Sequence, residues 1–309
     1  MPTLGIDLGG TFARAAVVDE QGRILSVSKT ALAERSPTAV VEAIAQAAAA
    51  AVEAAGVVVE ACGVGAAGQI HGDTGVLAVG PNLGWRNVPL GAMLRTRLGY
   101  RIRVVNDLSA AAWGELHAGA GRGAQDTFTV FVGSGVGSAI IAGGRLVSGA
   151  GGVAGELGHI KVVPNGRRCG CGELGCLEAY VGGHNLIAQT RELLATGHSA
   201  VLTELTGGDP ARVTPVTLEQ AAEAGDPEAR EVYERAGLML ALAVANQVTV
   251  LNPARLILGG GVLTHCPGLR RRVLEGVQAY SSTTAREGLL ITEAELGDNS
   301  GLIGAGLLA

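Results

Sequence analysis

The chain has 309 residues, of which 48% are hydrophobic and 17% are charged, and its formal net charge at pH 7 is −5. This composition excludes a disordered chain, and the length exceeds what one hydrophobic core normally supports, so two domains are expected. The small negative charge gives no electrostatic reason to bind nucleic acid or an anionic membrane, and neither partner is expected.

The first residues read MPTLGIDLGGT and contain neither the basic nor the apolar segment of a secretory signal. The longest apolar stretch, 43–55, is rich in alanine and is interrupted by Gln46 and Glu53, so a membrane span is not expected. Three of the five cysteines lie close together, which in a reducing compartment indicates metal binding before disulfides. We therefore expect a cytoplasmic protein.

Short strands and glycine turns alternate at the start of the chain. The pattern predicts a three-stranded meander whose strands lie at 3–7, 13–19 and 23–30. A helix should follow, with Ser36 as its N-cap, Pro37 in its first turn and Gly56 at its end. Further strands are expected at 62–66 and 101–106, and a second helix at 107–119.

Residues 127–148 repeat the pattern of the opening. A strand at 127–132, a glycine loop at 133–137, a strand at 138–142 and a strand at 145–148 follow one another. An internal repeat of this kind predicts two related α/β domains that begin with a glycine-cornered hairpin and hold a ligand between them. The later segments should form helices at 177–195, 226–251 and 301–308 and a strand at 255–258.

Both glycine loops have the chemistry of a phosphate site. Glycines at a strand corner let backbone N–H groups approach an anion, and a hydroxyl adds a donor. An ordinary hairpin turn is the alternative, but two such loops at repeat-related positions favour a nucleotide. Asp7 would repel phosphate unless Mg²⁺ lies between them. The candidate residues are Asp7, Gly9, Gly10 and Thr11 in the first loop and Gly133, Ser134, Gly135 and Gly137 in the second.

Asn106 and Asp107 stand at a junction between a strand and a helix. Asp107 would be a natural N-cap, which is the simpler interpretation. In a ligand site the same carboxylate could accept a proton from a sugar hydroxyl, while Asn106 bonds neighbouring hydroxyls.

Three thiols and one imidazole form the most specific motif of the chain. His159, Cys169, Cys171 and Cys176 are a four-ligand set that suits a tetrahedral, structural zinc ion. A disulfide with one spare thiol, or three free thiols, are the alternatives. Glu156 and Glu178 flank the set, either as surface carboxylates or as rigid partners for sugar hydroxyls. Near the other end of the chain, Gly260 and Gly261 follow a predicted strand. They could form a plain turn, or they could let the backbone approach an adenosine.

Taken together, these residues resemble the ROK family of sugar kinases and repressors, and within it the bacterial glucokinases. The likeness spans essentially the whole chain and is most specific in HIKVVPNGRRCGCGELGCLEAY. GIDLGGT and VGSGVGSAII are similar to the family's two phosphate loops, and PNLGWRNVPL and VVNDLSAAAWGE to its sugar-side segments.

The resemblance implies a two-domain, actin-like (ribonuclease-H-like) α/β fold with an interdomain cleft, and transfer of the ATP γ-phosphate to the 6-hydroxyl of glucose. It implies domains at 1–119 with 298–309 and at 120–297, and we expect a homo-oligomer, either a dimer or a tetramer. ATP, Mg²⁺ and one Zn²⁺ per chain are the expected cofactors. Asp107 is the implied catalytic base, and the implied sugar ligands are Gly68, Asn82, Asn106, Asp107, Glu156, His159 and Glu178.

Two alternatives remain open at this point. Another hexose, such as fructose, allose, N-acetylglucosamine or N-acetylmannosamine, would suit the same family pattern. A sugar-binding repressor is disfavoured, because the first strand starts near Thr3 and leaves no room for a helix-turn-helix.

The segment at 66–69 also departs from the family's proline-glycine pair, which weakens the assignment of Gly68.

Overall fold

The computed structural model describes residues 1–309 apart from the side chain of Asp73. The chain forms two compact units whose division passes through strands β9 (Thr127–Val132) and β10 (Val136–Ala142). The sequence-based boundaries, 1–119 with 298–309 and 120–297, stay a prediction. The first unit comprises Met1–Thr127, Ala139–Gly155 and Glu293–Ala309, and the second Phe128–Ser138 and Glu156–Thr292.

The first unit is built on a five-stranded sheet with the order β3-β2-β1-β4-β8. The first three strands pair antiparallel as the predicted meander, and β4 and β8 run parallel to β1. Each predicted meander strand is confirmed to within one residue at either end. The strands are β1 (Thr3–Leu8), β2 (Phe12–Val18), β3 (Ile24–Ala31), β4 (Ala61–Ala66) and β8 (Arg101–Asn106).

Helix α1 (Pro37–Ala55) covers one face of this sheet. Ser36 caps it and Gly56 ends it in the left-handed conformation, as predicted. Among the described residues it is the one helix long and apolar enough to cross a membrane. Its apolar face is instead occupied, because Val40 and Ile44 pack in one core with Ile6 of β1. Helix α1 is therefore a core helix of the first unit.

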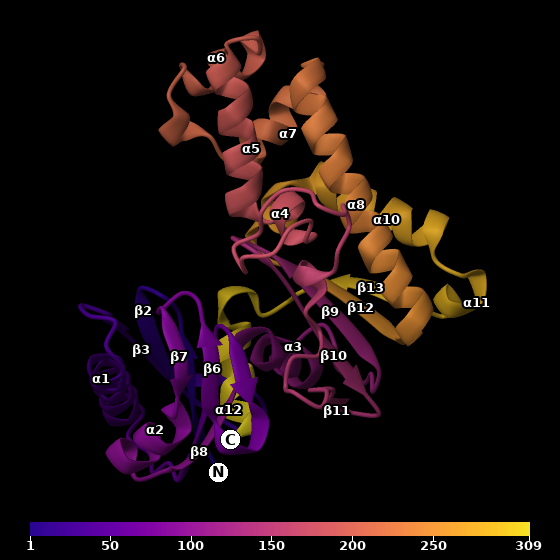
Figure 1. Ribbon diagram of the computed structural model, residues 1–309. Helices are drawn as coiled ribbons and strands as arrows, with labels where there is room; N and C mark the ends of the chain where they lie inside the picture. The colour runs from indigo at the N-terminus through magenta and orange to yellow at the C-terminus, as the bar shows by residue number, and fades with distance from the viewer. The chain divides into compact units, whose positions relative to one another are not determined.

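The other face carries α3 (Asp107–Ala118) and the C-terminal helix α12 (Ser300–Leu308). In Figure 1, α12 (yellow) lies among the indigo and purple elements of the N-terminal part. Successive residues of a strand point to opposite faces, so Ala16 and Val18 pack against Leu302 of α12, whereas Ala15 and Val17 face the α1 side.

A buried carboxylate fixes the return of the C-terminal segment. Glu115 of α3 is fully buried, and its oxygens accept hydrogen bonds from the backbone N–H groups of Ala120, Glu295 and Leu296 at 2.9, 3.1 and 2.9 Å. These bonds satisfy the buried charge and join residues far apart in sequence.

Close contact between α3 and α12 depends on glycine. A Cβ at Gly304 would lie 1.7 Å from the carbonyl oxygen of Ala110, and one at Gly114 would lie 2.5 Å from that of Ser300. Neither carbonyl belongs to a side chain that can move aside. The two helices must therefore separate if either glycine acquires a side chain.

We expect Gly304→Ala to lower the free energy of unfolding by about 3 kcal/mol, since overpacking a rigid contact costs this order of energy. Gly301→Ala in the same helix is the matched control. Its Cβ would meet nothing closer than 3.9 Å, so the higher helix propensity of alanine should leave stability equal or slightly raised. Urea unfolding followed by circular dichroism measures both. Equal stability of the two variants would contradict the proposed helix contact.

The first unit also contains a three-stranded sheet, with the order β5-β6-β7, and helix α2 (Leu90–Leu98), which were not predicted. The strands are too short to show a clear alternation of apolar residues. Trp85 anchors the sheet, because its ring is buried and its indole N–H donates to the carbonyl of Arg35 at 2.6 Å. The strands are β5 (Gln69–His71), β6 (Val76–Gly80) and β7 (Trp85–Val88).

The second sheet has the order β11-β10-β9-β12-β13. Strand β10 begins at Val136, inside the segment predicted as a glycine loop, so that loop is shorter than expected. The helix predicted at 177–195 is interrupted at Gly182, whose ψ of 141° is not helical. The remaining strands are β11 (Arg145–Leu146), β12 (Arg255–Gly259) and β13 (Leu290–Glu293).

Helices make up most of the second unit, and the long α8 packs along α10. The predicted helix at 226–251 is confirmed, with Asp226 as its N-cap. The helices are α4 (Glu178–Val181), α5 (Gly183–Thr196), α6 (Ala200–Thr206), α7 (Pro215–Glu223), α8 (Pro227–Leu251), α9 (Gly261–His265), α10 (Pro267–Tyr280) and α11 (Thr283–Arg286).

Candidate active site and metal centre

The carboxyl ends of three parallel strands gather the candidate residues of the first unit. Leu8 pairs with Ala66, and Ala66 pairs with Asn106, so β1, β4 and β8 end at the same edge of the sheet. The glycine turn after β1, Gly68 and Asp107 all follow these ends. Ligands of open α/β sheets bind at this kind of edge.

Asn106, and not Asp107, caps helix α3. Its Oδ1 accepts from the N–H groups of Leu108 and Ser109 at 2.9 and 3.2 Å, and its Nδ2 donates to the carbonyl of Gly68 at 3.0 Å. The simpler interpretation of Asp107 as the cap is therefore wrong. Asp107 occupies the first helical position, where its Oδ1 also accepts from the N–H of Leu108 at 2.9 Å.

The predicted sugar-side residues Gly68 and Asn82 also lie in this part of the first unit. Gly68 has a φ of +132°, and a Cβ there would lie 2.2 Å from the carbonyl oxygen of Val79. A Cβ at Gly10 would lie 3.2 Å from the carbonyl oxygen of Asn82. The turn after β1 and the segment before β7 therefore touch. The structure thus brings the first glycine turn, Asn82, Gly68 and Asn106 to one region.

Asp7 faces a guanidinium that the sequence analysis did not single out. Arg14 Nη1 lies 3.8 Å from Asp7 Oδ2, and Arg14 also donates to the carbonyl of Asp298 and to Asn299 Oδ1, both at 2.6 Å. Burial raises the pKa of Asp7, and Arg14 partly offsets this rise. The hairpin register, in which Asp7 pairs with Arg14, is the signal that would have revealed this partner.

In the second unit, the loop between β9 and β10 is confined to residues 133–135. Gly137 belongs to β10, so its predicted place in the loop is wrong. Gly260 lies against the end of β9, since a Cβ there would lie 2.5 Å from the carbonyl oxygen of Val132. A Cβ at Gly261 would meet no atom within 4 Å apart from its chain neighbours and its own helix backbone. The second glycine loop and Gly260 are therefore neighbours.

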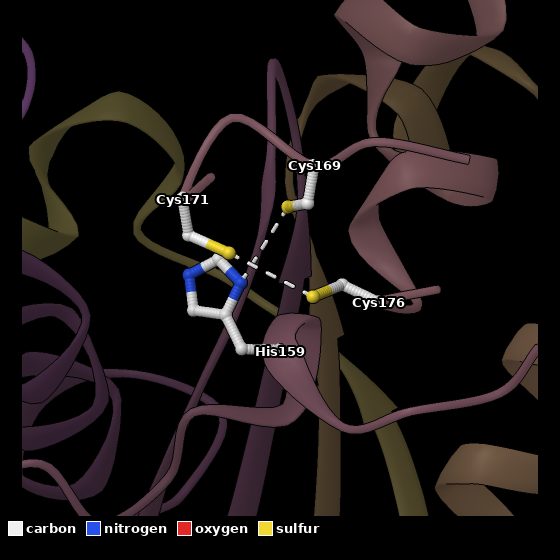
Figure 2. Close-up of side chains that lie close together, drawn as sticks. All are labelled: His159, Cys169, Cys171 and Cys176. Atoms are coloured by element: carbon white, nitrogen blue, oxygen red, sulfur yellow. Dashed lines mark hydrogen bonds between the residues drawn. The ribbon is translucent and has the colours of Figure 1, made fainter. Parts of the chain in front are cut away.

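Figure 2 shows the predicted metal ligands side by side. One ligand atom from each of His159, Cys169, Cys171 and Cys176 lies within 4.8 Å of all the others. Cys171 Sγ lies 3.7 Å from Cys176 Sγ, and His159 Nδ1 lies 3.8 Å from Cys169 Sγ. Tetrahedral bonds of about 2.3 Å from zinc to sulfur place two ligands about 3.8 Å apart, so the four residues fit zinc.

The backbone around the thiols is shaped by glycine and by short turns. Gly172 N donates to the carbonyl of Cys169, and Cys169 N to the carbonyl of Glu173. Gly175 has a φ of +78°, and a Cβ there would lie 1.8 Å from the carbonyl oxygen of Val163. These glycines allow three thiols within a stretch of eight residues to converge.

The two ring nitrogens of His159 face different partners. Nδ1 is directed at the thiols, whereas Nε2 lies 3.8 Å from Glu156 Oε2. Burial raises the pKa of Glu156, and the nearby His159 partly offsets the rise. The predicted sugar ligands Glu156 and His159 are thus brought together beside the candidate metal ligands.

Lys161 is a further partner of the cluster that the sequence analysis missed. Its Nζ donates to Cys176 Sγ at 3.0 Å and forms an ion pair with Glu173. The backbones of Lys161 and Cys176 also form an isolated β-bridge. A cation at this distance offsets negative charge on three thiolates.

The ROK family model matches residues 3–309. A glucokinase from Streptomyces coelicolor is 35% identical over 310 residues, covering 99% of this chain and 97% of that protein. An N-acetylmannosamine kinase from Salmonella newport is 32% identical over 313 residues, covering 100% of this chain and 98% of that protein.

A ROK family glucokinase from Streptomyces griseus, solved in complex with glucose and AMPPNP, superposes with a TM-score of 0.83 at 37% identity. The match covers 100% of this chain and 99% of that one. The predicted two-domain, actin-like α/β fold is thereby confirmed. With a family match along nearly its entire length, this chain belongs to the ROK family.

Proposed function

We propose that the protein phosphorylates glucose at its 6-hydroxyl with ATP, giving glucose 6-phosphate and ADP. The observation that carries this proposal is the end-to-end similarity to a glucokinase solved with glucose and AMPPNP. The presence of Asp107 at the carboxyl edge of the first sheet supports it, because this reaction needs a base next to the attacking hydroxyl.

In the proposed reaction Asp107 accepts the proton of the 6-hydroxyl while that oxygen attacks the γ-phosphorus. A bond forms between O6 and phosphorus, the bond from phosphorus to the β,γ-bridging oxygen breaks, and ADP leaves. Asn106 holds the start of α3 and Gly68 together, and so fixes where the Asp107 carboxylate stands. Phosphoryl transfer depends mainly on such positioning and on charge neutralisation.

The proposed sugar ligands are Gly68, Asn82 and Asn106 from the first unit and Glu156, His159 and Glu178 from the second. The proposed nucleotide ligands are the turn at 9–11, the loop at 133–135, Gly137, Gly260 and Gly261. Mg²⁺ would be held near Asp7 and would neutralise phosphate charge. Zinc would be held by His159, Cys169, Cys171 and Cys176, and would fix the sugar-side residues around His159.

We further propose that the protein works in the cytoplasm as a homo-oligomer. None of its five cysteines, all of which the structure describes, is part of a disulfide, which suits a reducing compartment. Size-exclusion chromatography with light scattering would give the oligomeric state.

A coupled assay of ATP consumption across a hexose panel tests the proposed function. We expect kcat/KM to be highest with glucose, compared with fructose, allose, N-acetylglucosamine and N-acetylmannosamine. The similarity to an N-acetylmannosamine kinase makes N-acetylmannosamine the second candidate substrate. A preference for this sugar would change the proposed substrate but keep the kinase activity. No consumption of ATP with any of these sugars would contradict a kinase and leave a sugar-binding role.

A further inference from the structure

One carboxylate in the second unit touches both the metal cluster and the second glycine loop. Glu178 Oε2 accepts a hydrogen bond from the backbone N–H of Val136 at 2.9 Å. Its other oxygen, Oε1, lies 3.6 Å from the sulfur of Cys169. Glu178 therefore stands between a metal ligand and the loop that carries the proposed nucleotide contacts.

The residues that follow Glu178 hold the same loop through the backbone. Gly183 N donates to the carbonyl of Gly133 at 2.9 Å, and His184 N donates to the carbonyl of Ser134 at 3.0 Å. With the bond from Val136 to Glu178, the segment 178–184 fixes two residues of the loop, Gly133 and Ser134, and the first residue of β10. This segment begins two residues after the metal ligand Cys176.

The packing between loop and segment leaves no space for adjustment. A Cβ at Gly135 would lie 2.4 Å from Glu178 Oε2, and one at Gly183 would lie 2.6 Å from the carbonyl oxygen of Gly133. On the side of His159, a Cβ at Gly158 would lie 2.3 Å from the carbonyl oxygen of Val136. A displacement of Glu178 must therefore displace the loop, since closely packed groups transmit small shifts.

The metal ligands in turn determine where Glu178 stands. Leu177, between Cys176 and Glu178, donates its N–H to the carbonyl of Ile160, which follows His159. Ligands on both sides of the cluster are thus joined to the start of α4. Without the metal, the ligand side chains would be held by the weak contacts between thiols and imidazole and by the bond from Lys161 to Cys176.

We propose that Glu178 is a positioning residue that links the metal cluster to the glycine loop at 133–135, so that zinc occupancy sets nucleotide affinity even without sugar. The inference rests on the proposed function, in which this loop binds ATP. It differs from a role of Glu178 as a sugar ligand alone, because that role predicts no effect on nucleotide binding in the absence of sugar.

Calorimetric titration of AMPPNP with excess Mg²⁺ and no glucose tests the proposal. We expect Glu178→Ala to weaken AMPPNP binding about tenfold, because the Val136 N–H loses a charged acceptor. Glu178→Gln offers an amide oxygen at the same place and should bind within about threefold of the wild type. Glu204→Ala is the control: it removes an exposed carboxylate of α6 in the same unit that makes no described contact with the loop or with the metal ligands, and should leave AMPPNP affinity unchanged.

A second experiment removes the zinc and measures AMPPNP binding again. Wild type and Glu178→Ala are titrated with AMPPNP, both as isolated and after treatment with a zinc-selective chelator. Elemental analysis measures the zinc content of each sample, and circular dichroism checks that it is folded. We expect zinc loss to weaken AMPPNP binding in the wild type and to have little further effect in Glu178→Ala. Such non-additivity is the signature of a shared pathway.

Three outcomes would overturn the inference. They are unchanged AMPPNP affinity in Glu178→Ala, an equal loss in the control Glu204→Ala, and an equal effect of zinc removal on wild type and Glu178→Ala. In each case the wild type would still phosphorylate glucose, so the proposed function would stand. A wild type that binds no AMPPNP and phosphorylates no sugar would instead remove the proposed function itself.

Discussion

Replacing Asp107 by asparagine is expected to reduce kcat for glucose phosphorylation by about 10²–10⁴-fold, the usual contribution of a positioned base. Asparagine retains the size of the side chain and an oxygen that can accept the bond from the Leu108 N–H, which Asp107 accepts at 2.9 Å. The helix keeps its own cap, because Asn106 performs that task. The expected fall in kcat therefore comes from the loss of a proton acceptor, because the structure of the helix should be retained.

Steady-state kinetics, glucose titration by calorimetry and thermal unfolding together test this expectation. Glucose affinity and melting temperature should stay close to those of the wild type while kcat falls. Asp209→Asn is the control, since it makes the same chemical change at the start of the short 3₁₀ helix Pro210–Arg212 in the second unit, and should leave kcat unchanged. A near-normal kcat in Asp107→Asn would refute the assignment of the base.

Loss of the metal cluster should have an effect of similar size. Cys171→Ser replaces a thiolate with a hydroxyl, which is a far weaker zinc ligand, so zinc content should fall well below the expected value of about one ion per chain. Glucose phosphorylation should then be abolished, because His159, Glu156 and Glu178 would lose the support that holds them in place. No zinc-bound water takes part in the proposed chemistry.

Elemental analysis beside the coupled assay measures both consequences. Cys266→Ser is the control, because Cys266 is a free thiol outside the cluster and lies at the N-cap of α10, where serine is favourable. This variant should retain zinc and activity. A preparation of Cys171→Ser that is free of zinc yet fully active would refute a structural role of the metal and would reopen the choice among hexoses.

Local sequence chemistry was sufficient for the motifs that depend on neighbouring residues. Spacing alone predicted the four candidate metal ligands, which the structure brings together, since three thiols within eight residues can converge without help from the rest of the fold. Helix α1 was predicted for the same reason, because Ser36, Pro37 and Gly56 act on the nearest turn of the backbone. The repeated hairpins followed from glycines that fix tight turns.

Contacts between residues far apart in the chain were decided only by the tertiary structure. The sequence favoured Asp107 as the helix cap and placed Gly137 in a loop, whereas Asn106 caps α3 and Gly137 lies in β10. Nor could it show that Glu178 bonds the N–H of Val136, 42 residues away. Such pairings arise when strands and helices pack, because that step selects which of several locally acceptable partners meet.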